Sequence, residues 1–222
     1  MISEQVPAEV SSSKQQPLAL RVMATIVSYL FHPVFIPLLM TFVLFRLSPV
    51  QFAGIQEKNL GLLLIQVALH TAFFPLLTVL LLKALGFIES IQLHNPKERI
   101  IPLMASMIFY FWAYWVFKNI NSPFILRTLL LGSFWGVIAV FMISIFFKIS
   151  MHTAGAGSMV GILVVLLFIS PVNMALPLFI AILVAGLIGT SRMILSAHVS
   201  SEIWLGYIVG FLVQVGAYWY LS

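Results

Sequence analysis

Residues 124–147 read FILRTLLLGSFWGVIAVFMISIFF and contain a single charged side chain, that of Arg127. An α-helix rises 1.5 Å per residue, so about 20 apolar residues are needed to cross a hydrocarbon core about 30 Å thick. This stretch meets that requirement in length and in composition. It therefore predicts a helix that crosses a membrane.

The same pattern recurs along the chain. Six further apolar stretches can be marked, at 18–46, 60–83, 101–117, 154–170, 174–190 and 203–221. The first contains His32, Pro33 and Pro37, and because a proline disfavours helix in the residue before it, this segment is predicted to kink or to lie partly in the interface. The sequence thus predicts an all-α, polytopic transmembrane helical bundle of six or seven spans.

Composition supports this fold class and sets the domain organisation. Of the 222 residues, 62% are hydrophobic and 8% are charged, whereas soluble domains carry roughly 25% charged residues. Residues 1–17 are polar and lack the basic start and apolar run of a cleavable signal peptide, so they are predicted to form a disordered tail. Residues 18–222 are predicted to form a single transmembrane domain.

The composition also excludes several function classes. The net charge is +5, but the eleven Lys and Arg residues are scattered singly between apolar runs, so no basic face for nucleic acid is predicted. The chain contains no Cys and no Asp. A cysteine zinc site, a thiolate nucleophile and a paired-aspartate magnesium site are therefore excluded, and neither a metal nor a cofactor is predicted.

Three polar connections hold most of the remaining chemistry: LHNPKERIIP (93–102), KISMHT (148–153) and TSRMILSAHVSSE (190–202). Two spans separate each connection from the next. An even number of crossings returns the chain to the same membrane face, whether or not the first segment spans. The sequence therefore predicts that these three connections form one site.

The third connection places His198 four residues before Glu202. On a helix this spacing brings both side chains to one face, so the carboxylate can accept a hydrogen bond from one imidazole nitrogen and leave the other as base or nucleophile. The second connection adds His152, a candidate general acid near neutral pH. These residues predict acid–base or nucleophilic chemistry.

The cations in these connections indicate the substrate class. Lys97, Arg99 and Arg192 have no matching set of carboxylates. Such a pocket suits an oxyanion, and guanidinium groups bind phosphate in bidentate fashion. Phosphate is therefore the predicted ligand, although Arg192, like Lys148, could instead anchor a span end at the interface.

Residues 191–202 carry Ser191-Arg192, five residues, His198, three residues and Glu202. This pattern resembles the third motif of the type-2 phosphatidic acid phosphatase superfamily, which also includes the vanadium haloperoxidases. That motif is S-R, five residues, H, three residues, D. The chain matches it at each defined position, with Glu in place of Asp.

Two other segments resemble the remaining motifs of this family, in the same order along the chain. ISMH at 149–152 is similar to the second motif, P-S-G-H, and keeps its Ser and His. The first motif, K, six residues, R-P, is matched least. Proline does not follow Arg99 directly and Gln92 stands at the lysine position, so Lys97 is the candidate substitute.

The resemblance implies a mechanism. His198 would attack phosphorus to form a phosphohistidine, Glu202 would orient it, and His152 would protonate the leaving oxygen. The residues that would hold the phosphoryl oxygens are Lys97, Arg99, Ser150, Ser191 and Arg192. The family's chemistry requires no metal.

The expected function is therefore that of a membrane lipid phosphate phosphatase, and residues 18–222 would be a phosphatase-like domain. Its substrate would be a phosphomonoester, or the terminal phosphate of a diphosphate, on an isoprenyl or glycerolipid carrier whose tail enters sideways between spans. By analogy with bacterial members of the family, the protein would lie in the cell membrane with its site on the outer face. The alternatives are an inactive relative, a transporter that binds an anionic lipid head group, or a scaffold subunit. His32 and His70 are predicted to be packing or interfacial residues.

Overall fold

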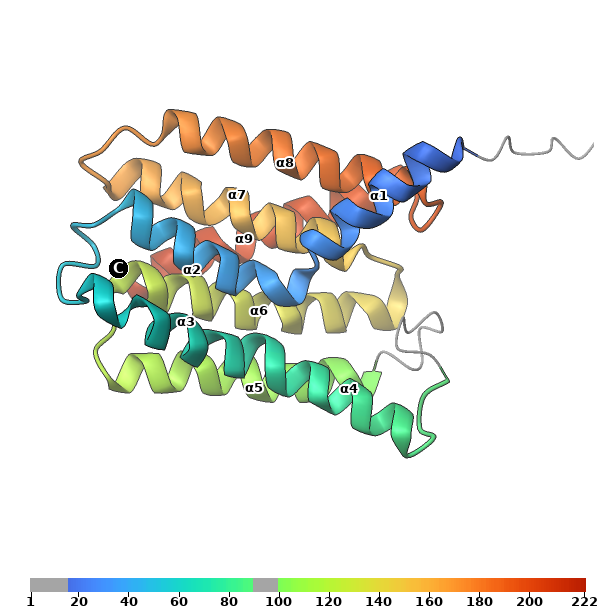
Figure 1. The fold of residues 1–222 in the computed structure, drawn as a ribbon, viewed down its shortest axis with the longest axis horizontal. Helices are drawn as coiled ribbons and strands as arrows, with labels where there is room; N and C mark the ends of the chain where they lie inside the picture. The colour runs from blue at the N-terminus through green and yellow to red at the C-terminus, as the bar shows by residue number, and fades with distance from the viewer. Residues whose placement is uncertain (1–15, 90–99) are drawn as a thin grey trace, which may run out of the picture.

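The polypeptide folds into helices that run side by side, as Figure 1 shows. The structure is a computed structural model that describes residues 16–89 and 100–222. In these two ranges every regular element is helical, and seven segments are long and apolar enough to cross a membrane. The predicted all-α polytopic bundle is confirmed, and the described residues provide seven spans.

The first span is broken near its middle. It consists of α1 (Leu18–Leu30), the short η1 (Pro33–Phe35) and α2 (Ile36–Leu47). His32 is extended, with φ −63° and ψ 133°, because Pro33 disfavours helical geometry in the residue before it. The kink predicted from the two prolines is therefore present, and it turns α1 away from α2 so that α1 packs along α8 (Figure 1).

The second span is also irregular. It contains η2 (Glu57–Asn59), α3 (Leu60–Ala68), a π-helical turn η3 (Leu69–Phe73) and α4 (Phe74–Ala84). Pro75 lies in the first turn of α4 and has no N–H to give to an earlier carbonyl, so the turn before it widens. The sequence predicted one continuous span here and did not predict the π-helical turn.

The remaining spans are unbroken, and each of their ends lies within four residues of the predicted one. They are α5 (Ile100–Asn119), α6 (Phe124–Phe146), α7 (Met151–Ile169), α8 (Ala175–Ile194) and α9 (Ser200–Leu221). Of the 18-residue apolar stretch in α7, 61% is buried inside the protein, compared with 28–33% of the corresponding stretches in the other six spans. Helix α7 is therefore the central helix of the bundle.

Glycines bring α7 and α9 into backbone contact. A Cβ atom added to Gly157 would collide with the Tyr207 carbonyl, and one added to Gly210 would collide with the Ala154 carbonyl. Gly206 faces Ser150 and Thr153 in the same way, at the start of α7. Small residues of this kind let two helices approach closely, and here they hold α7 and α9 against each other from their first turns onward.

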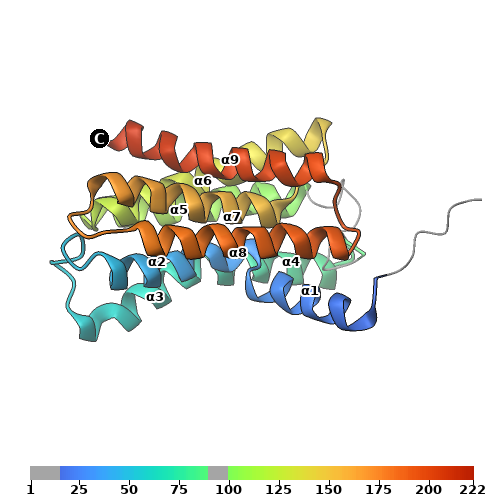
Figure 2. The same cartoon turned by 90° about the horizontal axis from the view of Figure 1, so that it is seen from above.

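The first turns of α5, α7 and α9 and the last turns of α6 and α8 lie at one end of the bundle, as the two views in Figures 1 and 2 show. Helix α1 begins and α4 ends at this end too. At the opposite end, an exposed ion pair of 2.6 Å joins Arg46 to Glu57. Among the described residues, the polar side chains predicted to form a site belong to the first of these two ends.

Candidate active site

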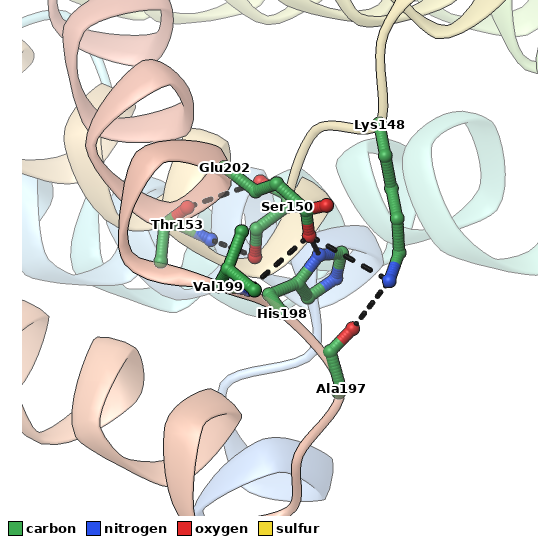
Figure 3. A network of polar contacts seen from close by, with 7 residues as sticks. All are labelled: Lys148, Ser150, Thr153, Ala197, His198, Val199 and Glu202. Atoms are coloured by element: carbon green, nitrogen blue, oxygen red, sulfur yellow. Dashed lines mark hydrogen bonds and ion pairs between the residues drawn. The ribbon is translucent and has the colours of Figure 1, made fainter. Parts of the chain in front are cut away.

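The second and third polar connections meet in space. The Ser150 N–H donates to the Glu202 carbonyl at 3.3 Å, and the Lys148 ammonium donates to the Ala197 carbonyl at 2.9 Å (Figure 3). These two connections therefore converge, as the sequence predicts.

The first connection contributes Lys97 and Arg99, and both lie outside the described residues. The helices on either side of it, α4 and α5, end and begin at the site end of the bundle (Figure 1). The roles of Lys97 and Arg99 therefore stay predictions.

His198 and Glu202 form the pair that their spacing predicts, although His198 precedes helix α9. His198 Nδ1 lies 2.7 Å from Glu202 Oε2. Val199 is the N-cap residue in an extended conformation, and its N–H donates to the same oxygen at 3.4 Å. The Glu202 carboxylate thus caps α9, as an acidic residue at the third helical position commonly does, and orients the imidazole that lies just outside the helix (Figure 3).

Lys148 is the third partner of this carboxylate. Its Nζ lies 3.6 Å from Glu202 Oε2, and half of the lysine side chain (49%) is exposed. The sequence predicts Lys148 as an interfacial anchor, but its ammonium contacts Glu202 and the Ala197 carbonyl. The available signal was its position next to the ISMH segment (149–152), on the face shared by the three connections.

The geometry fixes which nitrogen of His198 is available for chemistry. An ionised carboxylate only accepts hydrogen bonds, so the proton of the neutral ring lies on Nδ1 and the Nε2 lone pair is free to attack. Burial lowers the pKa of His198 below its ordinary value of 6.5, and the charges of Lys148 and Arg192 lower this pKa further, while Glu202 acts in the opposite direction. His198 is therefore neutral at neutral pH, as a nucleophile must be.

His152 lies in the first turn of α7. Its Nε2 is 3.1 Å from the Ser28 carbonyl. The His32 ring stands edge-on to the His152 ring, with centroids 5.3 Å apart and an interplanar angle of 84°. His32 thus packs against another ring, as expected. The partner, which the sequence did not predict, is a candidate catalytic histidine, and the break in the first span places the two rings together.

Arg192 carries a fixed positive charge that acts on three imidazoles. It belongs to the last turn of α8, and its Nη1 donates to the Ser28 hydroxyl at 3.0 Å. Its guanidinium interacts electrostatically with His32, His152 and His198. A fixed positive charge thus acts on the candidate catalytic histidines, an arrangement suited to binding a phosphoryl group.

The two serines predicted to bind phosphate have other contacts in the structure. Ser150 is fully buried, and its Oγ caps α7 by accepting from the Thr153 N–H at 3.4 Å. Ser191 is 3% exposed, and its hydroxyl donates to the Ile188 carbonyl at 2.7 Å. Both hydroxyls are buried and have contacts within the protein, at the ends of α7 and α8 that carry His152 and Arg192. Their predicted phosphate contacts stay predictions.

The described residues contain no group of three or more His, Cys, Asp or Glu side chains placed to hold a metal ion.

Two apolar hollows border the site. The first is a partly open cavity of about 120 Å³ whose lining includes Pro33, Met151 and Gly136. Pro33 and Met151 adjoin His32 and His152 in sequence. The second is a groove of about 550 Å³ between α8 and α9, which Gly186 helps to line. Either could receive hydrocarbon, and the first has walls next to both histidines.

No family model, no curated protein and no solved structure matches this chain. The resemblance to type-2 phosphatidic acid phosphatases rests on the segments at 149–152 and 191–202, with a weaker match near Arg99. This resemblance stays a prediction.

Proposed function

We propose that this protein is a membrane lipid phosphate phosphatase that transfers a phosphoryl group first to His198 and then to water. The observation that carries the proposal is the 2.7 Å contact between His198 Nδ1 and Glu202 Oε2, which leaves Nε2 as the nitrogen that can react, while Lys148 Nζ lies 3.6 Å from the same carboxylate oxygen. An oriented neutral imidazole next to a fixed cation is an arrangement suited to nucleophilic attack on phosphorus.

In the first step, His198 Nε2 attacks phosphorus and the bond from phosphorus to the lipid oxygen breaks. The leaving oxygen takes a proton from His152. Arg192 and Lys148 balance the negative charge on the phosphoryl oxygens. Lys97 and Arg99 would contribute further positive charge. The products of this step are the lipid alcohol, or the lipid monophosphate from a diphosphate, and phosphohistidine.

In the second step, water attacks the phosphorus of the phosphohistidine. His152 accepts a proton from this water, the phosphorus–nitrogen bond breaks, and its electron pair returns to Nε2 of His198. Inorganic phosphate leaves and both histidines regain their starting states. The same residue thus acts as acid in the first step and as base in the second.

Two features support a lipid as the carrier of the phosphate. The polar cluster lies at the ends of apolar spans, where a head group meets the hydrocarbon, and the cavity next to His32 and His152 is lined mainly by apolar side chains. A tail in that cavity would lie against Pro33 and Met151, next in sequence to His32 and His152. By analogy with the bacterial proteins that the chain resembles, we place the protein in the cell membrane with this end on the outer face.

The purified protein should release inorganic phosphate from at least one member of a panel of isoprenyl and glycerolipid phosphates. This release should persist after exhaustive chelation and should be inhibited by orthovanadate, which takes the five-coordinate geometry of the reacting phosphorus. Phosphate release is the measurement. Activity lost on chelation and restored by magnesium would contradict the mechanism, while vanadate binding without any phosphate release would indicate the alternative function of head-group binding.

Gly136→Leu should lower kcat/KM for a long-chain lipid phosphate by about tenfold, the loss expected when roughly two methylenes at about 0.8 kcal/mol each lose their site. The atom nearest to an added Cβ at Gly136 lies 3.6 Å away, so the substitution fills the cavity without forcing the backbone. Turnover of a short, water-soluble phosphate ester should change little, because that ester has no tail.

The matched control is Gly186→Leu in the groove between α8 and α9. An added Cβ there has no atom within 4 Å. This variant should retain the activity of the unaltered protein on both substrates. If Gly186→Leu instead suppresses turnover of the long-chain lipid and Gly136→Leu does not, the tail binds in the groove and the assignment to the cavity is wrong.

A further inference from the structure

Ser28, near the end of α1, connects the two halves of the candidate site. Its hydroxyl accepts a hydrogen bond from Arg192 Nη1 at 3.0 Å and lies 3.3 Å from Ser191 Oγ. Its carbonyl lies 3.1 Å from His152 Nε2. Ser28 is 7% exposed, and it belongs to none of the three polar connections predicted to form the site.

The carbonyl of Ser28 is available because α1 ends there. The last carbonyls of a helix have no partner within it. The N–H of Phe31 donates to the Val27 carbonyl and that of His32 donates to the Tyr29 carbonyl, and the Ser28 carbonyl between them meets the imidazole of His152. The helix break that Pro33 imposes therefore supplies the acceptor for this histidine.

We propose that α1 is part of the catalytic site and that Ser28 is its positioning residue. A carbonyl only accepts hydrogen bonds, so it holds a proton on His152 Nε2 and leaves Nδ1 as the nitrogen that exchanges a proton with the leaving oxygen. The hydroxyl of Ser28 sets the direction of the Arg192 guanidinium. The roles of His152 and Arg192 rest on the proposed function, whereas the arrangement rests on the three contacts.

Ser28→Ala separates the contribution of the Ser28 hydroxyl from that of the Ser28 carbonyl. It removes the hydroxyl and keeps the backbone carbonyl, and alanine is a better helix former than serine, so α1 should still form. The loss of one hydrogen bond that orients Arg192 should weaken the binding of orthovanadate by about three- to tenfold. Ser28→Thr, which keeps a hydroxyl, should recover most of this affinity.

The experiment compares Ser28→Ala with Thr25→Ala in the full-length purified protein. Thr25 lies one turn earlier on α1, and its hydroxyl donates only to the Arg21 carbonyl of its own helix at 2.8 Å. Orthovanadate affinity is measured for both variants and for the unaltered protein, together with KM and kcat for a lipid phosphate. Ser28→Ala should weaken vanadate binding and raise KM with a smaller change in kcat, and Thr25→Ala should match the unaltered protein.

The outcomes distinguish this inference from the proposed function. If the unaltered protein releases phosphate and Ser28→Ala equals Thr25→Ala in vanadate affinity and KM, the positioning role is overturned and the proposed function stands. If the unaltered protein binds vanadate but releases no phosphate, weaker binding by Ser28→Ala still supports the positioning of Arg192, and the phosphatase proposal fails. An unaltered protein that does not bind vanadate overturns both.

Discussion

His198→Ala should lower phosphate release by about a thousandfold or more and should abolish any covalent phosphoenzyme. Removal of a nucleophile eliminates the first bond-forming step, so the residual rate reflects binding and electrostatics alone. The side chain is largely buried, with 7% of it exposed, and its Nδ1 is held by Glu202, so Nε2 has one direction in which to react. The measurements are single-turnover phosphate release and the trapping of a labelled intermediate in acid-quenched protein.

His70→Ala is the matched control for this prediction. His70 lies in the π-helical turn η3, and its Nδ1 contacts the Gln66 carbonyl of its own span at 2.8 Å. This variant should keep its activity and its phosphoenzyme. Glu202→Gln should slow turnover without removing the intermediate, because an amide changes the orientation and charge stabilisation of His198 while the nucleophile remains. If the label persists in His198→Ala, another group attacks phosphorus.

His152→Ala should reduce turnover of a lipid phosphate by about 10² to 10⁴-fold, the usual contribution of a positioned general acid. The lipid alkoxide is a poor leaving group and needs the proton that His152 supplies. A nitrophenyl phosphate should lose far less activity, because its phenolate departs without a proton. The measurement is the ratio of kcat/KM for the two substrates in the variant and in the unaltered protein.

Equal losses on the two substrates would contradict the role of His152 as an acid. That result would assign His152 to the binding of the phosphoryl group, together with Arg192. The comparison is informative because both substrates carry the same phosphoryl group and differ in the leaving oxygen. The His198→Ala variant provides the reference, since it should fail with either substrate.

The sequence predicts the parts of this protein that depend on position along the chain. The bilayer requires apolar runs of a minimum length, so the spans can be located, and the number of crossings then determines which connections share a face. The spacing of His198 and Glu202 is equally local, and their contact follows from it. Pro33 also acts locally, which is why the kink could be predicted.

The features that depend on the packing of distant helices could not be predicted. The position of Ser28 against Arg192 and His152 requires α1 to pack along α8, and nothing in residues 18–30 indicates that partner. Ser150 is another case, because the motif fixes its residue type while the backbone contact between α7 and α9 buries its hydroxyl. The position of His32 could be predicted in part, because a histidine that precedes a proline inside an apolar run lies where the helix is interrupted.

The backbone contact between α7 and α9 also determines which part of the site can move. Because Gly157 and Gly210 bring main chain against main chain, these two helices behave as one stiff body, and the distance from His152 to Glu202 is fixed with them. Helix α1 is joined to the rest of its span at the non-helical His32, where a hinge needs only a few backbone dihedral angles. Rotation of α1 about this hinge would move Ser28 relative to α7 and α8 without disturbing the contact between α7 and α9, so α1 is the part of the site that can shift at least cost to the bundle.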